Sequence, residues 1–209
     1  EHMRFAQDHG AAAALVVAPY YNRPNQDGLY AHFAYLAERC DLPIILYNVP
    51  SRTITDITVE TMTRLAKIPS IVGIKDASGN VARVTAQRLG CGVDFCQLSG
   101  NDDMTLGFMA MGGVGCISVT ANVAPALCAG FQAACAAGRW GEGVAVQDRL
   151  DPLHAALFSD ASPGPVKYAL NRVRPDMSSD VRLPMTPPSA ASRAAVEQAL
   201  ANAPLICSK

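Results

Sequence analysis

The string IVGIKDASGN, which covers residues 71–80, passes from an apolar run to a polar turn at one lysine, Lys75. The run is short and rich in β-branched side chains, as expected of a parallel strand that is covered on both faces. Ser78, Gly79 and Asn80 are typical turn formers and follow closely. The string therefore predicts a buried strand that ends at a lysine, at the edge where a βα connection begins.

Four similar apolar runs flank this strand, at residues 14–18, 43–47, 93–98 and 115–119. Amphipathic segments with helical spacing lie between the runs, at residues 27–39, 58–67 and 102–111. The strand ends recur about every 20–28 residues, which is the repeat of a parallel sheet or barrel built from βα units. The pattern predicts an α/β fold with five parallel strands.

Downstream of Thr120 the chain shows only helical patterns. They cover residues 123–137, 141–158, 163–173 and 189–202, with a proline-rich connector at 181–188. We therefore expect a barrel-like part, residues 1–122, and a helical part, residues 123–209. A closed (β/α)8 barrel needs eight strands. Five strands imply either an open sheet or a barrel that lacks its first three strands.

The composition excludes several classes of protein. Only 17% of the 209 residues are charged, 50% are hydrophobic, and the formal net charge is -1. This balance argues against a disordered chain, a nucleic-acid-binding protein and a polybasic membrane-surface protein. No apolar run reaches the roughly 18–20 residues of a membrane span. The seven cysteines form no CxxC pair and no metal-ligand spacing with histidines, which indicates reduced thiols in a cytoplasmic protein without a metal.

Polar side chains at the strand ends suggest an active site. An apolar barrel mouth favours the neutral form of an amine, and a free amine at Lys75 would add to a ketone as a Schiff base. The alternative is a structural lysine that is paired with Asp76. Tyr47, at the end of the preceding strand, is either a proton shuttle or a buried tyrosine with one hydrogen bond. Arg52 either binds a substrate carboxylate or is a solvated loop arginine.

Two adjacent tyrosines, Tyr20 and Tyr21, follow the first strand. Neighbouring residues on an extended chain point in opposite directions, so one tyrosine would enter the site and the other an interface. The alternative is packing of both rings at the rim. His32 and His154 lie in helical segments, where surface or core positions are more common than ligand positions.

Five strings at these strand ends resemble the 4-hydroxy-tetrahydrodipicolinate synthase family, also called the dihydrodipicolinate synthase family, within the pyruvate-dependent class I aldolases. They are PYYNRP at 19–24, YNVPSRT at 47–53, GIKDASGN at 73–80, LSGND at 98–102 and GCISVTAN at 115–122. The resemblance extends from Phe5 to Leu205 with matching order and spacing. By this resemblance, Lys75 matches the Schiff-base lysine that binds pyruvate, and Tyr47 matches the proton-relay tyrosine.

The remaining site residues are also assigned by the resemblance. Arg52 matches the arginine that holds the carboxylate of aspartate semialdehyde. Gly100 and Ile117 match positions that line the pyruvate site. Tyr21 matches the tyrosine that one subunit lends to its neighbour's relay. Tyr20 matches a tyrosine at the dimer interface, near the site where some members bind lysine as an inhibitor.

The resemblance further implies a (β/α)8 barrel with a C-terminal helical region, of which this chain would supply strands 4–8. The family's reaction condenses pyruvate with L-aspartate 4-semialdehyde in lysine and diaminopimelate biosynthesis, through a lysine–pyruvate imine and without a metal or organic cofactor. Its members are commonly cytoplasmic homotetramers built from two dimers. The family's Gly-Thr-Thr-Gly-Glu motif is absent from this chain. We therefore expect an N-terminally truncated chain that is inactive and poorly stable by itself.

Three alternatives stay open at this point. Sister aldolases, such as N-acetylneuraminate lyase or a 2-keto-3-deoxy sugar-acid aldolase, share the tyrosine and the lysine but generally lack an arginine at the place of Arg52. A non-catalytic relative that acts as a sensor or scaffold would be expected to lose Lys75 or Tyr47. An unrelated α/β binding module would use Lys75 only structurally.

Overall fold

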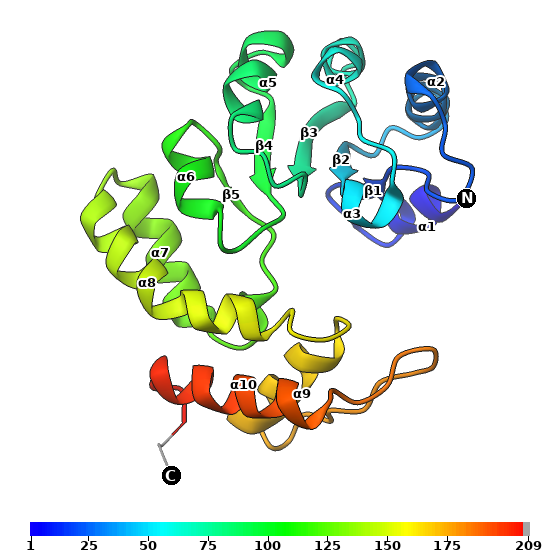
Figure 1. The fold of residues 1–209 in the computed structure, drawn as a ribbon. Helices are drawn as coiled ribbons and strands as arrows, with labels where there is room; N and C mark the ends of the chain where they lie inside the picture. Colours follow the sequence, from blue (N-terminus) through cyan, green and yellow to red (C-terminus); the bar gives the residue numbers. More distant parts are fainter. Residues whose placement is uncertain (207–209) are drawn as a thin grey trace. The chain divides into compact units, whose positions relative to one another are not determined.

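The computed structural model describes residues 1–206, and the chain divides into two units, Glu1–Ile117 and Ser118–Lys209. Figure 1 shows the course of the chain through the elements of each unit. The first unit contains α1 (His2–Asp8), β1 (Ala14–Val17), α2 (Gln26–Ala37), β2 (Ile44–Asn48), α3 (Pro50–Thr53), α4 (Val59–Leu65), β3 (Ile71–Asp76), α5 (Arg83–Cys91), β4 (Cys96–Ser99), α6 (Thr105–Ala110) and β5 (Gly115–Cys116).

The five strands form one parallel sheet in the order β1-β2-β3-β4-β5. Sequential neighbours pair along the whole sheet, as expected where each strand is joined to the next by a helical connection. This arrangement confirms the predicted α/β class and the five parallel strands. All strand carboxyl ends therefore lie at one edge, which is where α/β barrels carry their chemistry.

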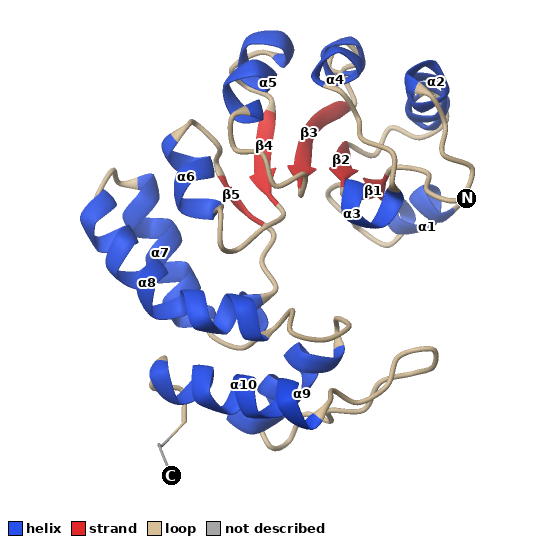
Figure 2. Ribbon diagram, viewed as in Figure 1, coloured by secondary structure: helices blue, strands red, loops and turns tan. Residues whose placement is uncertain are grey.

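One face of this sheet is buried under helices, as Figure 2 shows for α2, α4 and α5. The strands contribute Ile44, Leu46 and Ile74 to this core, and the helices contribute Phe33 and Met62, all fully buried. The opposite face is open in part, since Leu15 and Val17 of β1 are 44% and 37% exposed. Alternation along the strands thus separates a core face from a more accessible face.

The second unit is helical. It contains the 3-10 turn η1 (Thr120–Asn122), α7 (Pro125–Ala136), α8 (Trp140–Ala156), α9 (Gly164–Val173) and α10 (Ala190–Asn202). Its core is a cluster of buried apolar side chains that includes Leu150, Leu153 and Leu200. His154 is buried here, and its Nδ1 lies 2.7 Å from the Thr120 hydroxyl, so it is a hydrogen-bonded core residue.

Several boundaries differ from those that the sequence predicts. The pattern predicts a strand at 93–98, but β4 begins at Cys96 because the chain turns just before it, with the Phe95 N–H donating to the Gly92 carbonyl at 3.4 Å. The pattern also predicts a strand at 115–119, but β5 ends at Cys116. Its neighbour β4 ends at Ser99. The hydrogen bond from the Ile117 N–H to the Ser99 carbonyl is therefore the last one between these two strands.

Helix α5 is absent from the prediction altogether. Its two buried residues are Val84 and Gln87, so half of its inward face is polar. A buried polar residue hides the apolar period that a prediction from sequence relies on.

The close approach of β3 to β4 depends on Gly73. A Cβ at this position would lie 2.7 Å from the Cys96 Cβ and closer still to the Cys96 carbonyl oxygen. We expect Gly73→Ala to lower the free energy of unfolding by about 1–3 kcal/mol, because the two strands must move apart. Thermal unfolding measures the effect. Gly107→Ala in α6 is the matched control, because a Cβ there meets nothing within 4 Å and should be neutral or slightly stabilising. Equal melting temperatures for the two variants would contradict the expectation.

Candidate active site

Lys75 and Tyr47 lie side by side at the carboxyl edge of the sheet. They are directly opposite each other in the register of β2 and β3, and both are half-buried. The Lys75 Nζ lies 4.2 Å from the centroid of the Tyr47 ring, which is a cation–π contact. An amine and a phenol are thus held together on the accessible face of the sheet. The first can form an imine with a carbonyl compound, and the second can donate or accept a proton.

Lys75 is not paired with Asp76. Within residues 1–206 the ammonium takes part in no ion pair, whereas Asp76 is 5% exposed and lies 3.4 Å from the Arg83 Nε. The reason is the alternation of side chains along β3, which turns residues 75 and 76 to opposite faces. The interpretation of Lys75 as a structural lysine paired with Asp76 is therefore wrong.

Gly100 leaves room for the lysine side chain. A Cβ at this position would lie 3.2 Å from the Lys75 Cε and 2.7 Å from the Ala77 Cβ. Its N–H donates to the Asp76 carbonyl at 2.7 Å, so the end of β4 is tied to the end of β3. Ile117, half-buried, is tied in turn to β4 through its bond to Ser99. The structure thus places Lys75, Tyr47, Gly100 and Ile117 along one edge of the sheet.

The other predicted site residues are exposed. Tyr20 and Tyr21 are 63% and 88% exposed on this chain. Arg52 lies in α3, in the loop that follows Tyr47, and is exposed. Among the described residues, no hydrogen bond, ion pair or cation–π contact joins these three side chains to Lys75. Their assigned roles therefore stay predictions.

Four polar residues behind the strand ends were not predicted from the sequence. They are Asn48, Asp56, Arg83 and Gln87, and they are linked to Asp76 by hydrogen bonds and ion pairs. A signal for one of them, Asn48, and for Asp76 itself was present, because these two residues directly follow Tyr47 and Lys75. Strand alternation turns such residues toward the core, where a polar side chain needs partners.

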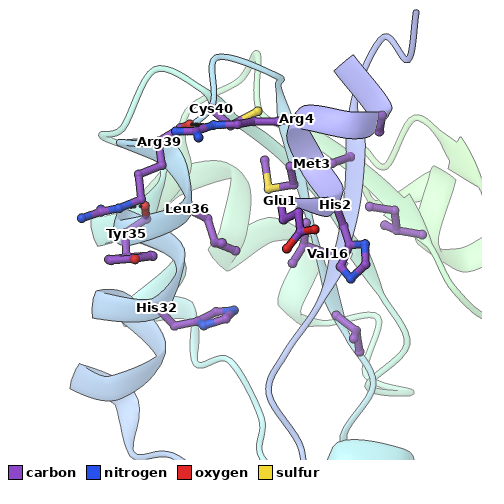
Figure 3. Close-up of a pocket in the computed structure, with 14 residues that line it drawn as sticks. Glu1, His2, Met3, Arg4, Val16, His32, Tyr35, Leu36, Arg39 and Cys40 are labelled. Atoms are coloured by element: carbon purple, nitrogen blue, oxygen red, sulfur yellow. Dashed lines mark hydrogen bonds between the residues drawn. The ribbon is translucent and has the colours of Figure 1, made fainter. Parts of the chain in front are cut away.

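A large cavity lies elsewhere, beside the edge strand β1 (Figure 3). Its volume is about 890 Å³, and its walls come from α1, β1 and α2, with Met3, Val16, His32 and Tyr35 among them. Burial lowers the pKa of the His32 imidazole, so the ring is neutral at pH 7. Tyr47, Lys75, Gly100 and Ile117 do not line this cavity, so its size does not mark the site of chemistry.

The remaining titratable groups agree with a protein of reduced thiols. No disulfide joins the six cysteines of the described residues, and burial raises the pKa of the Cys96 thiol, so it stays protonated at neutral pH. Cys207 lies outside the described residues. Within residues 1–206, no three metal-ligating side chains gather as a metal site would require. No helix in the same range is both long and apolar enough to cross a membrane.

Comparison with known proteins agrees with the geometry of the site. The sequence model of the dihydrodipicolinate synthetase family matches residues 2–203. The chain is 73% identical over 203 residues to a 4-hydroxy-tetrahydrodipicolinate synthase of Rhizorhabdus wittichii, covering 97% of this chain and 70% of that protein. It is 64% identical to the synthase of Zymomonas mobilis, covering 98% and 70% of the two chains.

A solved structure gives the same result. The crystal structure of a chloride-inhibited dihydrodipicolinate synthase from Acinetobacter baumannii, complexed with pyruvate, superposes with a TM-score of 0.94 at 41% identity. The match covers 98% of this chain and 70% of the other. Likeness in sequence along nearly the whole chain, and in fold, points to one conclusion: the chain belongs to the dihydrodipicolinate synthetase family.

Proposed function

We propose that this chain carries the Schiff-base chemistry of a 4-hydroxy-tetrahydrodipicolinate synthase, a class I aldolase-type lyase of lysine and diaminopimelate biosynthesis. The substrates are pyruvate and L-aspartate 4-semialdehyde. The observation that carries the proposal is the Lys75 Nζ at 4.2 Å from the Tyr47 ring, at the carboxyl edge of a parallel sheet. Relatives at 73% and 64% identity bear the name of this enzyme.

In the first half of the reaction, the Lys75 amine attacks C2 of pyruvate. Loss of water from the resulting carbinolamine gives an iminium ion, which draws electrons from the adjacent methyl group. The methyl group then loses a proton to form an enamine. Tyr47 carries the protons of these steps, because its phenol is held beside the amine. The imine is the electron sink, so the reaction needs no added cofactor.

In the second half, the enamine carbon attacks the aldehyde carbon of the semialdehyde. Arg52 receives the carboxylate of this substrate, because a guanidinium binds a carboxylate with two parallel hydrogen bonds. The substrate amine then attacks the former C2 and closes the ring. Lys75 is expelled, and its amine is regenerated.

The oligomer and its location are also proposals. Tyr21 is 88% exposed on this chain, which supports its assignment to the relay of a neighbouring subunit. Tyr20, 63% exposed, would lie at the same contact. We assign a homo-oligomer built as a dimer of dimers, with no nucleic-acid or membrane partner. Free cysteine thiols support a cytoplasmic location.

The competing functions have less support. Sister aldolases generally lack an arginine at the place of Arg52, whereas this chain has one. A scaffold would not need to keep Lys75 beside Tyr47. The expectation that residues 1–209 turn over no product by themselves stays a prediction, supported by the open face of β1 on the site's side of the sheet.

The test of the proposed function uses the native gene product that contains this sequence. We expect pyruvate and borohydride to leave a carboxyethyl group on Lys75, detected by peptide mass spectrometry. We also expect product to form when aspartate semialdehyde is added, and no pyruvate to be released from N-acetylneuraminate or a 2-keto-3-deoxy sugar acid. Labelling of Lys75 together with cleavage of either sugar acid would contradict the choice of second substrate. Absence of any label on Lys75 would contradict the chemistry itself.

A further inference from the structure

Two buried polar side chains lie directly behind the catalytic pair. Asn48 follows Tyr47 at the end of β2, and Asp76 follows Lys75 at the end of β3. Both point to the helix-covered face, where Asn48 is fully buried and Asp76 is 5% exposed. Residues 48 and 76 are opposite each other in the sheet register, one step beyond residues 47 and 75. Contacts that hold these two side chains in place therefore also hold the backbone that carries the Lys75 amine and the Tyr47 phenol.

Arg83, from the first turn of α5, joins the two strand ends. Its Nη1 lies 2.7 and 2.9 Å from the two carboxylate oxygens of Asp56, and its Nε lies 3.4 Å from the Asp76 Oδ2. Its other terminal nitrogen donates to the Ile57 carbonyl. Gln87, one turn further along α5, donates to the Asp76 Oδ2 at 2.6 Å. A single guanidinium, 14% exposed, thus bridges two carboxylates from different segments.

Asn48 closes the loop that carries Arg52. Its Nδ2 donates to the Asp56 Oδ1 at 2.7 Å, and its Oδ1 accepts from the Ile57 N–H at 3.0 Å. Residues 49–55 therefore leave β2 and return to the same asparagine side chain. The loop cannot slide along the sheet unless these two hydrogen bonds break.

The loop is also held in an unfavourable backbone conformation. Ile54 has a φ of +62°, which is rare for a β-branched side chain. Such a conformation persists only where the surroundings impose it. On one side of Ile54, the Thr53 hydroxyl lies within hydrogen-bond distance of the Val49 and Thr55 carbonyls, at 3.1 and 2.8 Å. On the other side, the hydrogen bonds of Asp56 with Asn48 and Arg83 hold the end of the loop.

We propose that Asn48, Asp56, Asp76, Arg83 and Gln87 form a strand-end network whose function is positioning. It sets the distance between the Arg52 loop and the Lys75–Tyr47 pair, and hence the fit of the second substrate to the enamine. The inference rests on the proposed function, because it assigns Arg52 to the substrate carboxylate. None of the five side chains takes part in the chemistry. Their hydrogen bonds and ion pairs hold the backbone of the strand ends and of the Arg52 loop in place.

The test is kinetic and uses Arg83→Met in the native gene product. We expect the KM for aspartate semialdehyde to rise about tenfold and kcat/KM to fall by between about tenfold and a hundredfold, because a small displacement of a binding group is costly in rate. The fraction of Lys75 that pyruvate and borohydride label at saturation should stay at the wild-type level. Arg83→Lys keeps the positive charge but cannot contact Asp56, Asp76 and the Ile57 carbonyl at the same time. It should therefore recover only part of the lost activity.

Two further variants keep the result interpretable. Arg172→Met removes a half-buried guanidinium paired with Glu197 in the helical unit, and should lower the melting temperature without changing KM. Should Arg83→Met fail to fold, Asp56→Asn serves instead, because Asp56 is 38% exposed and asparagine still accepts from Asn48. Folded Arg83 or Asp56 variants with wild-type KM and kcat would overturn the inference. Failure of the wild type to label Lys75 would overturn the proposed function instead.

Discussion

Replacing Lys75 with alanine is expected to abolish labelling by pyruvate and borohydride and to lower kcat by on the order of 10⁴-fold or more. The variant has no amine with which to form the imine, and loss of a covalent nucleophile removes the whole reaction path. The fold should persist, because the lysine makes no ion pair within residues 1–206 and is only half-buried. Circular dichroism and thermal unfolding verify the fold, and peptide mass spectrometry follows the label.

Lys67→Ala is the matched control for this result. Lys67 is an exposed lysine of the same unit, and its replacement should change neither labelling nor rate. Lys75→Arg adds a second check, because it keeps a positive charge that never becomes a nucleophile, and should be as inactive as alanine. Undiminished labelling of the alanine variant would mean that another group forms the imine.

Tyr47→Phe is the second substitution with a large expected effect. We expect kcat to fall by about 10²- to 10⁴-fold, which is the usual contribution of a general acid or base. The phenyl ring should still lie under the Lys75 ammonium, so the cation–π contact survives and only the hydroxyl is lost. The time course of borohydride labelling should slow, whereas the extent of labelling at long times should approach that of the wild type.

Tyr30 offers a matched control, since the Arg64 guanidinium lies 4.4 Å from its ring centroid in a second cation–π pair of the same unit. Tyr30→Phe removes the same hydroxyl group from a comparable contact and should leave the rate unchanged. A Tyr47→Phe enzyme with wild-type kcat and labelling rate would exclude the phenol from the proton relay.

The positions of Lys75 and Tyr47 were accessible from the sequence because their signal is local. Each ends a short apolar run, and the carboxyl ends of parallel strands meet at one edge of a sheet. The register that sets residue 47 opposite residue 75 was not accessible, because it depends on pairing between strands. Helix α5 escaped prediction for a related reason: it buries Gln87, whose partner Asp76 is brought to it only by the fold.

The sequence by itself determined the class of the fold, the succession of its five parallel strands, and which side chains stand at the strand ends. These features follow from periodicity and turn chemistry within a few neighbouring residues. Only the tertiary structure decided the partners of the buried charges. Arg83 binds Asp56, 27 positions away, and Lys75 lies against Tyr47 rather than Asp76. The physical reason is that desolvated charges must find partners across the core, and the choice among them depends on geometry that no local pattern encodes.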